Sequence, residues 1–545
     1  MARTKALLWA LPPILGALAA LLLEGASAQQ DPLIDPLRYR EACPDYLAYS
    51  KRGHPPRSEG DLHLPFQRPS PHCRTFTSSH VEKVIEDMSE KMLDKDLARI
   101  FENAFPNTLD TTVRWHVDGK ERPKKAIHPD KGVWDGAQSF IVTGDINAEW
   151  LRDSTNQLAQ YQILAKKDPA ISNLILGAIN TQVEFVIKFP YCNAFQPPAP
   201  SRLQPVGNGQ TDAVHPNYEP GFVFECKYEL DSLAHFLSLG NQYWAHTKNK
   251  AFLTSRWYKA IDTVLEVIAQ QSKGTFEKNG KYVQNEYRFQ RQTNTGTETL
   301  GLSGVGNPLA NDTGLVRSAF RPSDDATILG FFIPANAFIA VELERTADML
   351  KEIGGKATLA ETLQDLSDRI REGIWEHGVV THKKYGKVFA YEVDGYGGQI
   401  LMDDANLPSL LALPLLGFLD NREETYQNTR KMILEKSGNP YYLQGREFHG
   451  IGGPHIGLEY AWPMSLLVQA MTSDDDDEIM DNLMLVRNAS RLGLVHESIN
   501  VKFLVDYTRP WFAWANSVFA QTIINIAQRK PHLLFGEGEQ AYVFE

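Results

Sequence analysis

Two adjacent aspartates, Asp324 and Asp325, follow Arg321-Pro322-Ser323 and directly precede an apolar run. Aspartate and serine before an apolar run are preferred helix caps, and the helix dipole stabilises an ionised carboxylate in the first turn. In the alternative interpretation, one carboxyl group protonates a substrate and the other grips it. Mutual repulsion and burial raise the pKa of one member of such a pair, as a general acid requires. The pair by itself is compatible with both.

Other groups capable of acid–base chemistry gather in five further polar segments. They are carboxylates with neighbouring aromatic, basic and amide side chains: Asp145, Glu149, Trp150, Arg152 and Asp153; Glu225, Glu229 and Asp231; Asp403, Asp404 and Asn406; His449, His455, Tyr460 and Trp462; and His496, Glu497, Arg509, Trp511 and Trp514. Such groups suit a neutral polyhydroxylated ligand. Hydrolysis of a glycosidic bond needs two carboxyl groups in opposed roles, one as acid and the other as base or nucleophile. Composition alone does not identify which two of these carboxyl groups have the two roles.

Each candidate also has a structural interpretation. A helix-capping role is the structural interpretation of Asp153, Asp403-Asp404 and Asp474–Asp477. Asp231 is compatible with a buried ion pair with Lys227 or an arginine, and histidines and tryptophans often have structural roles. Glu497 is the least easily explained in this way, because Val-His-Glu-Ser-Ile-Asn is neither an evident cap nor part of a periodic helix.

Helices must position these residues, because apolar side chains recur with helical spacing along most of the chain. Twelve helices are predicted, starting near Val81, Leu151, Ala170, Tyr228, Lys250, Asp325, Ala357, Ala405, Glu423, Ala461, Asp475 and Trp511. Short joins between them alternate with long connectors rich in Gly, Pro and Asp, at 102–150, 190–227, 272–324, 377–404, 435–460 and 493–510. Short joins make antiparallel pairs, so six pairs closed in a ring place every long connector at one end. The sequence therefore predicts an all-α (α/α)6 barrel. Two or three separate helical domains are the alternative, although no low-complexity linker divides the chain.

Charge and the N-terminal segment limit the possible partners and the compartment. The formal net charge of −12 and pI near 5.7 argue against nucleic acid and anionic membranes. Residues 1–28 have the basic start, apolar stretch and Ala26-Ser27-Ala28 site of a signal peptide, with an uncleaved signal anchor as the alternative. We therefore expect a secreted protein or one of the secretory pathway, the Golgi included. Residues 29–75 are predicted to form an N-terminal arm, and 76–545 the barrel.

The cysteines and the glycosylation sequons are typical of a protein that enters the secretory pathway. Four cysteines are present, and proximity favours the disulfides Cys43–Cys73 and Cys192–Cys226 over the other connectivities. Asn311 and Asn488 begin glycosylation sequons. No Cys/His spacing resembles a zinc site, so no metal or cofactor is predicted. The acidic clusters would still permit calcium, which a chelator would expose.

Several long strings resemble glycoside hydrolase family 125, the exo-acting α-1,6-mannosidases. They are TGDINAEWLRDS, KYELDSL, SAFRPSDDA, YEVDGYGG with LMDDANLPSLL, GIGGPH, and HESINVK with TRPWFAWANS, and they run in order from about Val81 to about Gln528. The resemblance implies an (α/α)6 barrel that inverts anomeric configuration without a metal. It implies a terminal α-mannoside of a glycan as substrate.

The resemblance also implies roles for individual residues. The general acid lies in the Phe320–Asp325 segment, and we expect Asp324, with Asp325 as the alternative. Glu497 would be the base that activates water, roughly 6.5–9.5 Å from the acid as in inverting glycosidases. Residues expected to line the sugar subsite are Trp150, Arg152, Asp153, Asp404, His455 and Trp514. Glu149 departs from the Met expected in bacterial members and is expected to add a charge near the site.

Two rival functions remain at this point. Another exo-α-glycosidase on the same barrel, such as a glucoamylase-like enzyme, differs in only one or two hydroxyl contacts. A carbohydrate-binding protein that has lost catalysis is the alternative from another class, and retention of both candidate carboxylates argues against it. The oligomeric state is left open.

Overall fold

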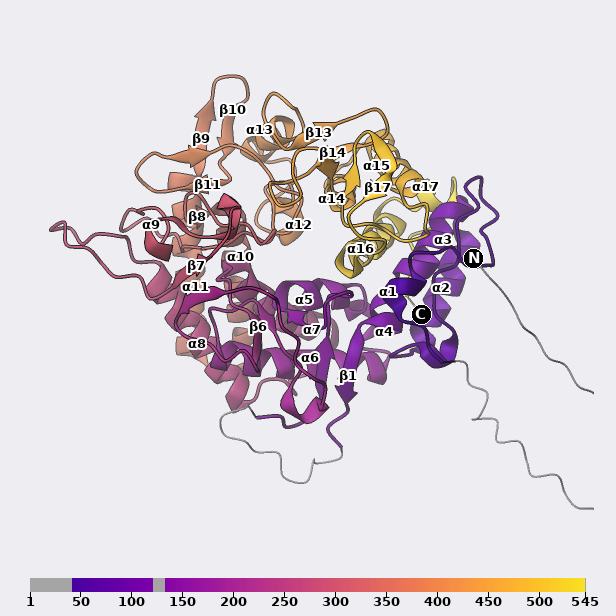
Figure 1. Ribbon diagram of the computed structural model, residues 1–545, viewed down its shortest axis with the longest axis horizontal. Coiled ribbons are helices and arrows are strands. Elements are labelled where there is room, and N and C mark those ends of the chain that lie inside the picture. The colour runs from indigo at the N-terminus through magenta and orange to yellow at the C-terminus, as the bar shows by residue number, and fades with distance from the viewer. Residues whose placement is uncertain (1–41, 121–132, 545) are drawn as a thin grey trace, which may run out of the picture. The chain divides into compact units, whose positions relative to one another are not determined.

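The computed structural model describes residues 42–120 and 133–544. Those from Pro44 onward form one compact unit. The predicted signal peptide and the first part of the predicted arm lie outside the described residues. The helices of this unit form two rings around a common centre (Figure 1).

The chain alternates between the outer and the inner ring. The outer helices are α3 (Lys95–Ala104), α6 (Pro169–Lys188), α8 (Ser255–Gln271), α11 (Ala357–Gly373), α13 (Glu424–Ile433) and α15 (Asp476–Ala489). The inner helices are α5 (Leu151–Ala159), α7 (Leu230–Thr247), α10 (Ile333–Ile353), α12 (Leu413–Leu416), α14 (Pro463–Met471) and α16 (Ala513–Arg529). Helix α5 packs against α7 and α16, α10 against α7 and α12, and α14 against α16. This is the predicted (α/α)6 barrel.

Burial explains why the two rings differ in sequence. Inner helices are apolar nearly all round because they contact both their neighbours and the outer ring, and most of α10 is buried. Outer helices carry one apolar stripe, as in α8, where Trp257, Ile261 and Val264 are buried. Helix α6 is the one described helix with the length and apolar composition of a membrane span. The most apolar stretch of this helix is 67% buried within the fold, and burial of this kind is also typical of a core helix.

Small antiparallel sheets fold the long connectors at one end of the barrel. The pairs are β1 (Val113–Val117) with β2 (Gln138–Ile141), β5 (Asp212–His215) with β7 (Arg288–Arg291), β9 (Val379–His382) with β10 (Gly386–Phe389), and β13 (Tyr442–Gln444) with β14 (His449–Ile451). The three-stranded sheets are β3 (Glu149–Trp150), β4 (Ala194–Phe195) and β6 (Val223–Glu225); β8 (Phe331–Phe332), β11 (Glu392–Val393) and β12 (Gln399–Ile400); and β15 (Tyr460–Ala461), β16 (Ile499–Asn500) and β17 (Phe503–Tyr507). Strands β3, β8 and β15 each lead into an inner helix or end one residue before it.

Shorter elements complete the unit. The remaining α-helices are α1 (Tyr46–Tyr49), α2 (Ser79–Lys91), α4 (Asn107–Thr111), α9 (Gly301–Gly304) and α17 (His532–Phe535). Single turns of 3-10 helix are η2 (Pro71–Cys73), η3 (Gln162–Leu164), η4 (Ala199–Ser201) and η5 (Gly296–Glu298), and η6 (Ile374–Gly378) is a π-helical turn.

Two predicted helix starts are wrong, and both concern candidate site residues. The apolar run after Asp325 forms no helix until Ile333, where Pro334 occupies the first turn of α10. The run after Ala405 forms no helix until Leu413. Strand pairing overrides apolar spacing in the first case, and a proline does so in the second. Phe331 and Phe332 pair with β11, and Pro408 disfavours a helical conformation in the residue before it.

Segment 44–75 packs on the barrel through buried polar contacts. The Gln67 amide donates to the Leu492 carbonyl at 2.8 Å. Arg68 pairs with Asp110 at 2.7 Å and with Glu82 at 2.5 Å. Because these contacts are buried or half-buried, this segment is part of the folded unit.

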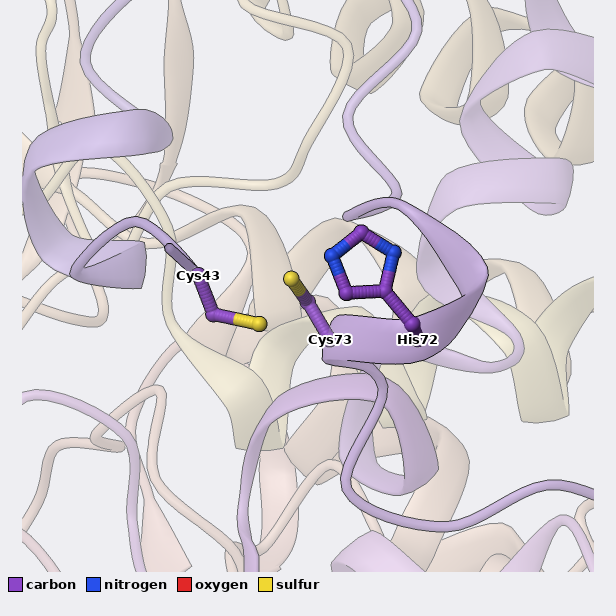
Figure 2. Close-up of side chains that lie close together, drawn as sticks. All are labelled: Cys43, His72 and Cys73. Atoms are coloured by element: carbon purple, nitrogen blue, oxygen red, sulfur yellow. The ribbon is translucent and has the colours of Figure 1, made fainter. Parts of the chain in front are cut away.

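Both predicted disulfides are present. Cys192 and Cys226 are joined with a sequence separation of 34, and the Cys43–Cys73 disulfide is also formed. Figure 2 shows the Cys43 and Cys73 side chains near that of His72. These three residues could bind a metal only if both cysteines were free thiolates. The disulfide therefore removes these sulfurs as zinc ligands.

Candidate active site

A pocket opens over the N-terminal ends of the inner helices, with about 440 Å³ of space between protein atoms. Trp150, Trp462 and Phe512, which occupy the N-cap positions of α5, α14 and α16, all line it. The sequence places polar connectors before each inner helix, and residues from five distant segments line the pocket. The positive ends of several helix dipoles converge there, which favours carboxylates.

Seven of the nine predicted catalytic and substrate-binding residues line this pocket: Trp150, Arg152, Asp153, Asp324, His455, Glu497 and Trp514. The other two, Asp325 and Asp404, are buried behind its wall with exposed fractions of 1% each. The structure thus separates the two members of the aspartate pair, and the expected member, Asp324, is the one that lines the pocket.

Glu497 is held in a fixed orientation by two partners on the following loop. Its Oε2 atom accepts a hydrogen bond from the Thr508 hydroxyl at 2.7 Å. Its Oε1 atom lies 3.1 Å from Nη1 of Arg509, whose Nε lies 3.2 Å from Asp145. Both contacts stabilise an ionised carboxylate at the pocket wall.

Asp324 stands at the tip of a tight turn rather than at a helix terminus. The Arg321 amide donates to the Asp325 carbonyl at 2.8 Å, and the Asp324 amide donates to the Arg321 carbonyl at 3.0 Å. Asp324 has a φ of +70°, a left-handed conformation that non-glycine residues seldom adopt. The helix-capping interpretation of the pair is therefore wrong, and the turn points only one of the two carboxylates into the pocket.

Opposing influences act on the pKa of Asp324. Burial raises it, but the nearby charges of Lys227, Arg152 and His455 outweigh burial and hold the pKa of Asp324 below its ordinary value. The distance from its Oδ1 to Nη2 of Arg152 is 3.8 Å. Asp324 is therefore ionised in the ligand-free site at neutral pH.

Asp325 and Asp404 have the opposite electrostatics. Burial and the neighbouring charge of Asp404 raise the pKa of Asp325, whose Oδ2 accepts from the Ser323 hydroxyl at 2.8 Å. Burial also raises the pKa of Asp404. Its Oδ1 accepts from the backbone amide of Asn406 at 3.0 Å and from the side-chain amide of that residue at 2.8 Å. Asp404 thus orients Asn406, which does line the pocket.

Arg152 is the centre of a buried carboxylate cluster at the base of the pocket. Its guanidinium lies 2.6 Å from Glu229, 3.5 Å from Asp153, 3.8 Å from Asp324 and 3.9 Å from Asp231. Burial raises the pKa of Asp153 to about 6 and that of Asp231 to about 7. The ion-pair interpretation of Asp231 is correct, with Arg152 rather than Lys227 as the partner. The Arg152 guanidinium also lies 5.3 Å from the ring centroid of Trp514, which fixes that indole.

Several buried polar atoms of the pocket have no hydrogen-bond partner among the described residues. They are the indole N–H groups of Trp150, Trp462 and Trp514 and one oxygen each of Asp153 and Asp324. Unsatisfied buried donors and acceptors are rare, because each costs about 1–3 kcal/mol. A ligand that carries several hydroxyl groups would satisfy donors and acceptors of this kind together.

Other candidates have structural roles. The His496 ring stacks on Tyr507 at 3.9 Å, hydrogen-bonds the Arg509 carbonyl at 2.8 Å, and has its pKa lowered by burial to about 4. Burial raises the pKa of Glu149 to about 8. Glu149 is therefore neutral at pH 7, and the expectation that it adds a charge near the site is wrong.

Helix capping is confirmed for the acidic segment Asp474–Asp477. The Asp475 carboxylate accepts from the Glu478 amide at 3.0 Å and begins α15. Asp403 instead accepts from the amides of Leu410 and Leu411 at 2.9 Å each, in the loop before α12, so the capping interpretation of Asp403 is wrong. Among the predicted glycosylation sites, Asn311 is exposed in a loop, whereas Asn488 is half-buried near the end of α15.

The sequence prediction missed Arg509, Asn406, Trp462, Thr508 and Lys227 as functional residues. The first three belong to the polar segments and were recognisable as chemically capable, but nothing in the sequence distinguishes them from their neighbours. Thr508 and Lys227 act through side-chain geometry or charge, for which the sequence carries no signal.

Comparison with known proteins gives matches along most of the chain. Residues 94–524 match the family described as metal-independent alpha-mannosidase (GH125). The meiotically up-regulated gene 157 protein of Schizosaccharomyces pombe is 54% identical over 496 residues, covering 91% of this chain and 94% of that protein. A solved α-mannosidase structure from Streptococcus pneumoniae, in a non-productive substrate complex with α-1,6-mannobiose, is 32% identical. It has a TM-score of 0.72 and covers 83% of this chain and 99% of that one.

The barrel, the carboxylate-lined pocket and these matches define the class of protein: it is a glycoside hydrolase. The match over residues 94–524 identifies the family within this class. The chain belongs to glycoside hydrolase family 125, the metal-independent α-mannosidases.

Proposed function

We propose that the protein is an exo-α-1,6-mannosidase that releases a terminal mannose from a glycan with inversion of configuration. One observation carries the mechanism. Asp324 and Glu497, which come from connectors more than 170 residues apart in sequence, both line one narrow pocket. The α-1,6 linkage is supported by the mannobiose bound to the Streptococcus pneumoniae relative.

Glu497 acts as the general base in this proposal. Arg509 and Thr508 orient its carboxylate, and Gln would keep the shape of the side chain but not its basicity. Asp324 acts as the general acid that protonates the leaving oxygen. Inversion requires a water between the base and the sugar, so the two carboxyl groups are expected roughly 6.5–9.5 Å apart.

Because the pKa of Asp324 is low in the ligand-free site, Asp324 must acquire the proton that it donates when the substrate binds. An uncharged sugar that covers Asp324 removes water from the carboxylate, and this desolvation raises its pKa. A proton is then taken up when the substrate binds. Lys227 and Arg152 oppose this uptake, so the balance between them and burial sets the pH at which the acid functions.

The first experiment is proton NMR of the purified protein acting on α-1,6-mannobiose, recorded within the first minutes. The proposal expects β-mannose as the first product. Early α-mannose would require a nucleophile and a different role for Glu497. An untouched disaccharide would contradict the linkage specificity, and a panel of α-linked mannosides and glucosides would then test a glucoamylase-like activity. Binding without turnover would support a carbohydrate-binding protein.

Three variants test the assignment of the carboxylates. Asp324→Asn and Glu497→Gln are expected to lower kcat by about 10²–10⁴-fold each, the usual contribution of a general acid or base. Asp325→Asn is the matched control for Asp324, since it does not line the pocket. A near-normal kcat for Asp324→Asn with a large loss for Asp325→Asn would reverse the assignment.

We further propose that the protein functions in the secretory pathway or outside the cell. The signal-like residues 1–28, the two disulfides and the exposed sequon at Asn311 support this compartment. Expression in a eukaryotic secretory host followed by N-terminal sequencing tests it. A new N-terminus after Ala28 is expected, whereas retention of Met1 in a membrane fraction would indicate a signal anchor.

A further inference from the structure

A second cavity lies beneath the loop that carries Asp324, and one wall of it is the guanidinium of Arg317. Asn285, Tyr287, Leu300 and Thr327 form other parts of the wall, and about 260 Å³ lies between the protein atoms. Its open centre has room for about one particle of the size of a water molecule. No acidic side chain lines this cavity, although the chain carries a net charge of −12.

Arg317 is a buried cation without a counter-ion. Its exposed fraction is 7%, and no carboxylate of the described residues lies within ion-pair distance of it. One guanidinium nitrogen, Nη1, donates to the Val305 carbonyl at 2.9 Å. Buried charges are normally paired, because an unpaired one loses several kcal/mol of hydration.

Nearby groups do not compensate for the charge. The closest electrostatic neighbours of Arg317 are two tyrosines, Tyr228 and Tyr282. Burial raises the pKa of Tyr228 well above its ordinary value, so this phenol is neutral. As a result burial lowers the pKa of Arg317 to about 10, in contrast to Arg152 and Arg321, whose carboxylate partners raise theirs.

The hydroxyl groups that line the cavity already donate elsewhere. The hydroxyls of Thr327, Ser318 and Tyr287 already donate to backbone carbonyls at 2.7–2.9 Å. The Asn285 side-chain oxygen already accepts from Gln271 at 3.1 Å. The other guanidinium N–H groups of Arg317 and the side-chain amide of Asn285 have no partner among the described residues. A small acceptor with a negative charge would satisfy both.

We propose that this cavity binds a small monovalent anion, with chloride as the physiological ion, as the counter-ion of Arg317. The Arg317 end of the loop is tied to the segment just before α7, since the amides of Ala319 and Phe320 donate to the Tyr228 carbonyl at 3.1 and 3.0 Å. The loop closes where the Ser318 amide donates to the Gly330 carbonyl at 2.8 Å. The bound anion therefore stabilises the base of this loop, and Asp324 lies at the tip of the same loop.

The test uses the intact protein and thermal unfolding, which does not depend on the proposed enzymatic activity. Sodium gluconate is replaced stepwise by sodium chloride at constant ionic strength. A saturable rise in Tm is expected, about 2 °C when chloride reaches about 100 times its Kd in a chain of this length. Arg317→Gln removes the rise, while the control Arg422→Gln, whose side chain is 81% exposed, keeps it.

Diffraction from crystals grown with sodium bromide provides a measurement that needs no variant. An anomalous peak beside the Arg317 guanidinium is expected. Water density in the cavity together with equal Tm values in chloride and gluconate would overturn the proposal. Sulfate, which is too large for the cavity, should not reproduce the chloride effect.

Discussion

Replacement of Arg152 by methionine tests the charge cluster at the base of the pocket. Methionine keeps much of the apolar stem and removes the guanidinium. Arg152 lies 2.6 Å from Glu229 and within 4 Å of Asp153, Asp231 and Asp324, and its side chain is only 4% exposed. The substitution therefore leaves several buried carboxyl groups without their shared cation.

The magnitude follows from these distances. At an effective dielectric constant of ~20, a full charge at 2.6 Å gives about 6 kcal/mol of Coulomb attraction. Most of this is offset by the cost of removing the guanidinium from water, and breaking a buried pair costs a net ~3–5 kcal/mol. A chain of 545 residues has an unfolding entropy of about 1.1 kcal/mol per K, so Tm should fall by ~3–4 °C at pH 8.

The loss should also depend on pH, with a definite sign. The folded-state pKa values of Asp153 and Asp231 are raised to about 6 and about 7. Their contribution to stability is therefore present at low pH and lost as pH rises through these values. Arg152 is needed most at pH 8, where both are ionised. At pH 5 both are protonated, and the difference in Tm between Arg152→Met and the wild type should shrink.

The assay is differential scanning calorimetry of both proteins at pH 5 and pH 8. Arg422→Met serves as the control, because its pairing with Asp420 is on the surface, and its Tm should equal that of the wild type at both pH values. A loss below 1 °C at pH 8 would refute the reasoning. So would an equal loss at both pH values, because the carboxyl groups around Arg152 would then not carry the charges assigned to them.

Three further predictions concern separate parts of the molecule. Thr508→Val should lower kcat far less than Glu497→Gln does and leave KM nearly unchanged in steady-state assays, because Arg509 still holds the carboxylate; equal losses would contradict a mere orienting role. Lys227→Met should raise the pKa of Asp324, which moves the high-pH limb of kcat/KM to higher pH; a shift to lower pH would exclude Asp324 as the acid. Cys192→Ser should destabilise the fold by ~4 kcal/mol from the loss of a 34-residue closure, seen as a lower denaturant midpoint; an unchanged midpoint would mean that this bridge does not restrict the unfolded chain.

The alternation of short joins and long connectors was enough to predict the barrel. Helical spacing of apolar residues depends on local periodicity, and ten of the twelve predicted helices begin within about five residues of the observed start. Because every long connector precedes an inner helix, their polar residues had to meet at one end. Seven of the nine predicted site residues line the pocket for this reason.

Only the tertiary structure decided which carboxylates line the pocket. Asp324 and Asp325 are adjacent and of identical type, and a left-handed turn at Asp324 sends one into the pocket and buries the other. The charge state of Glu149 and the partner of Asp231 likewise depend on burial and on neighbours distant in sequence. Local spacing determines the helices and connectors, whereas the direction and pKa of a side chain depend on what the folded chain packs around it.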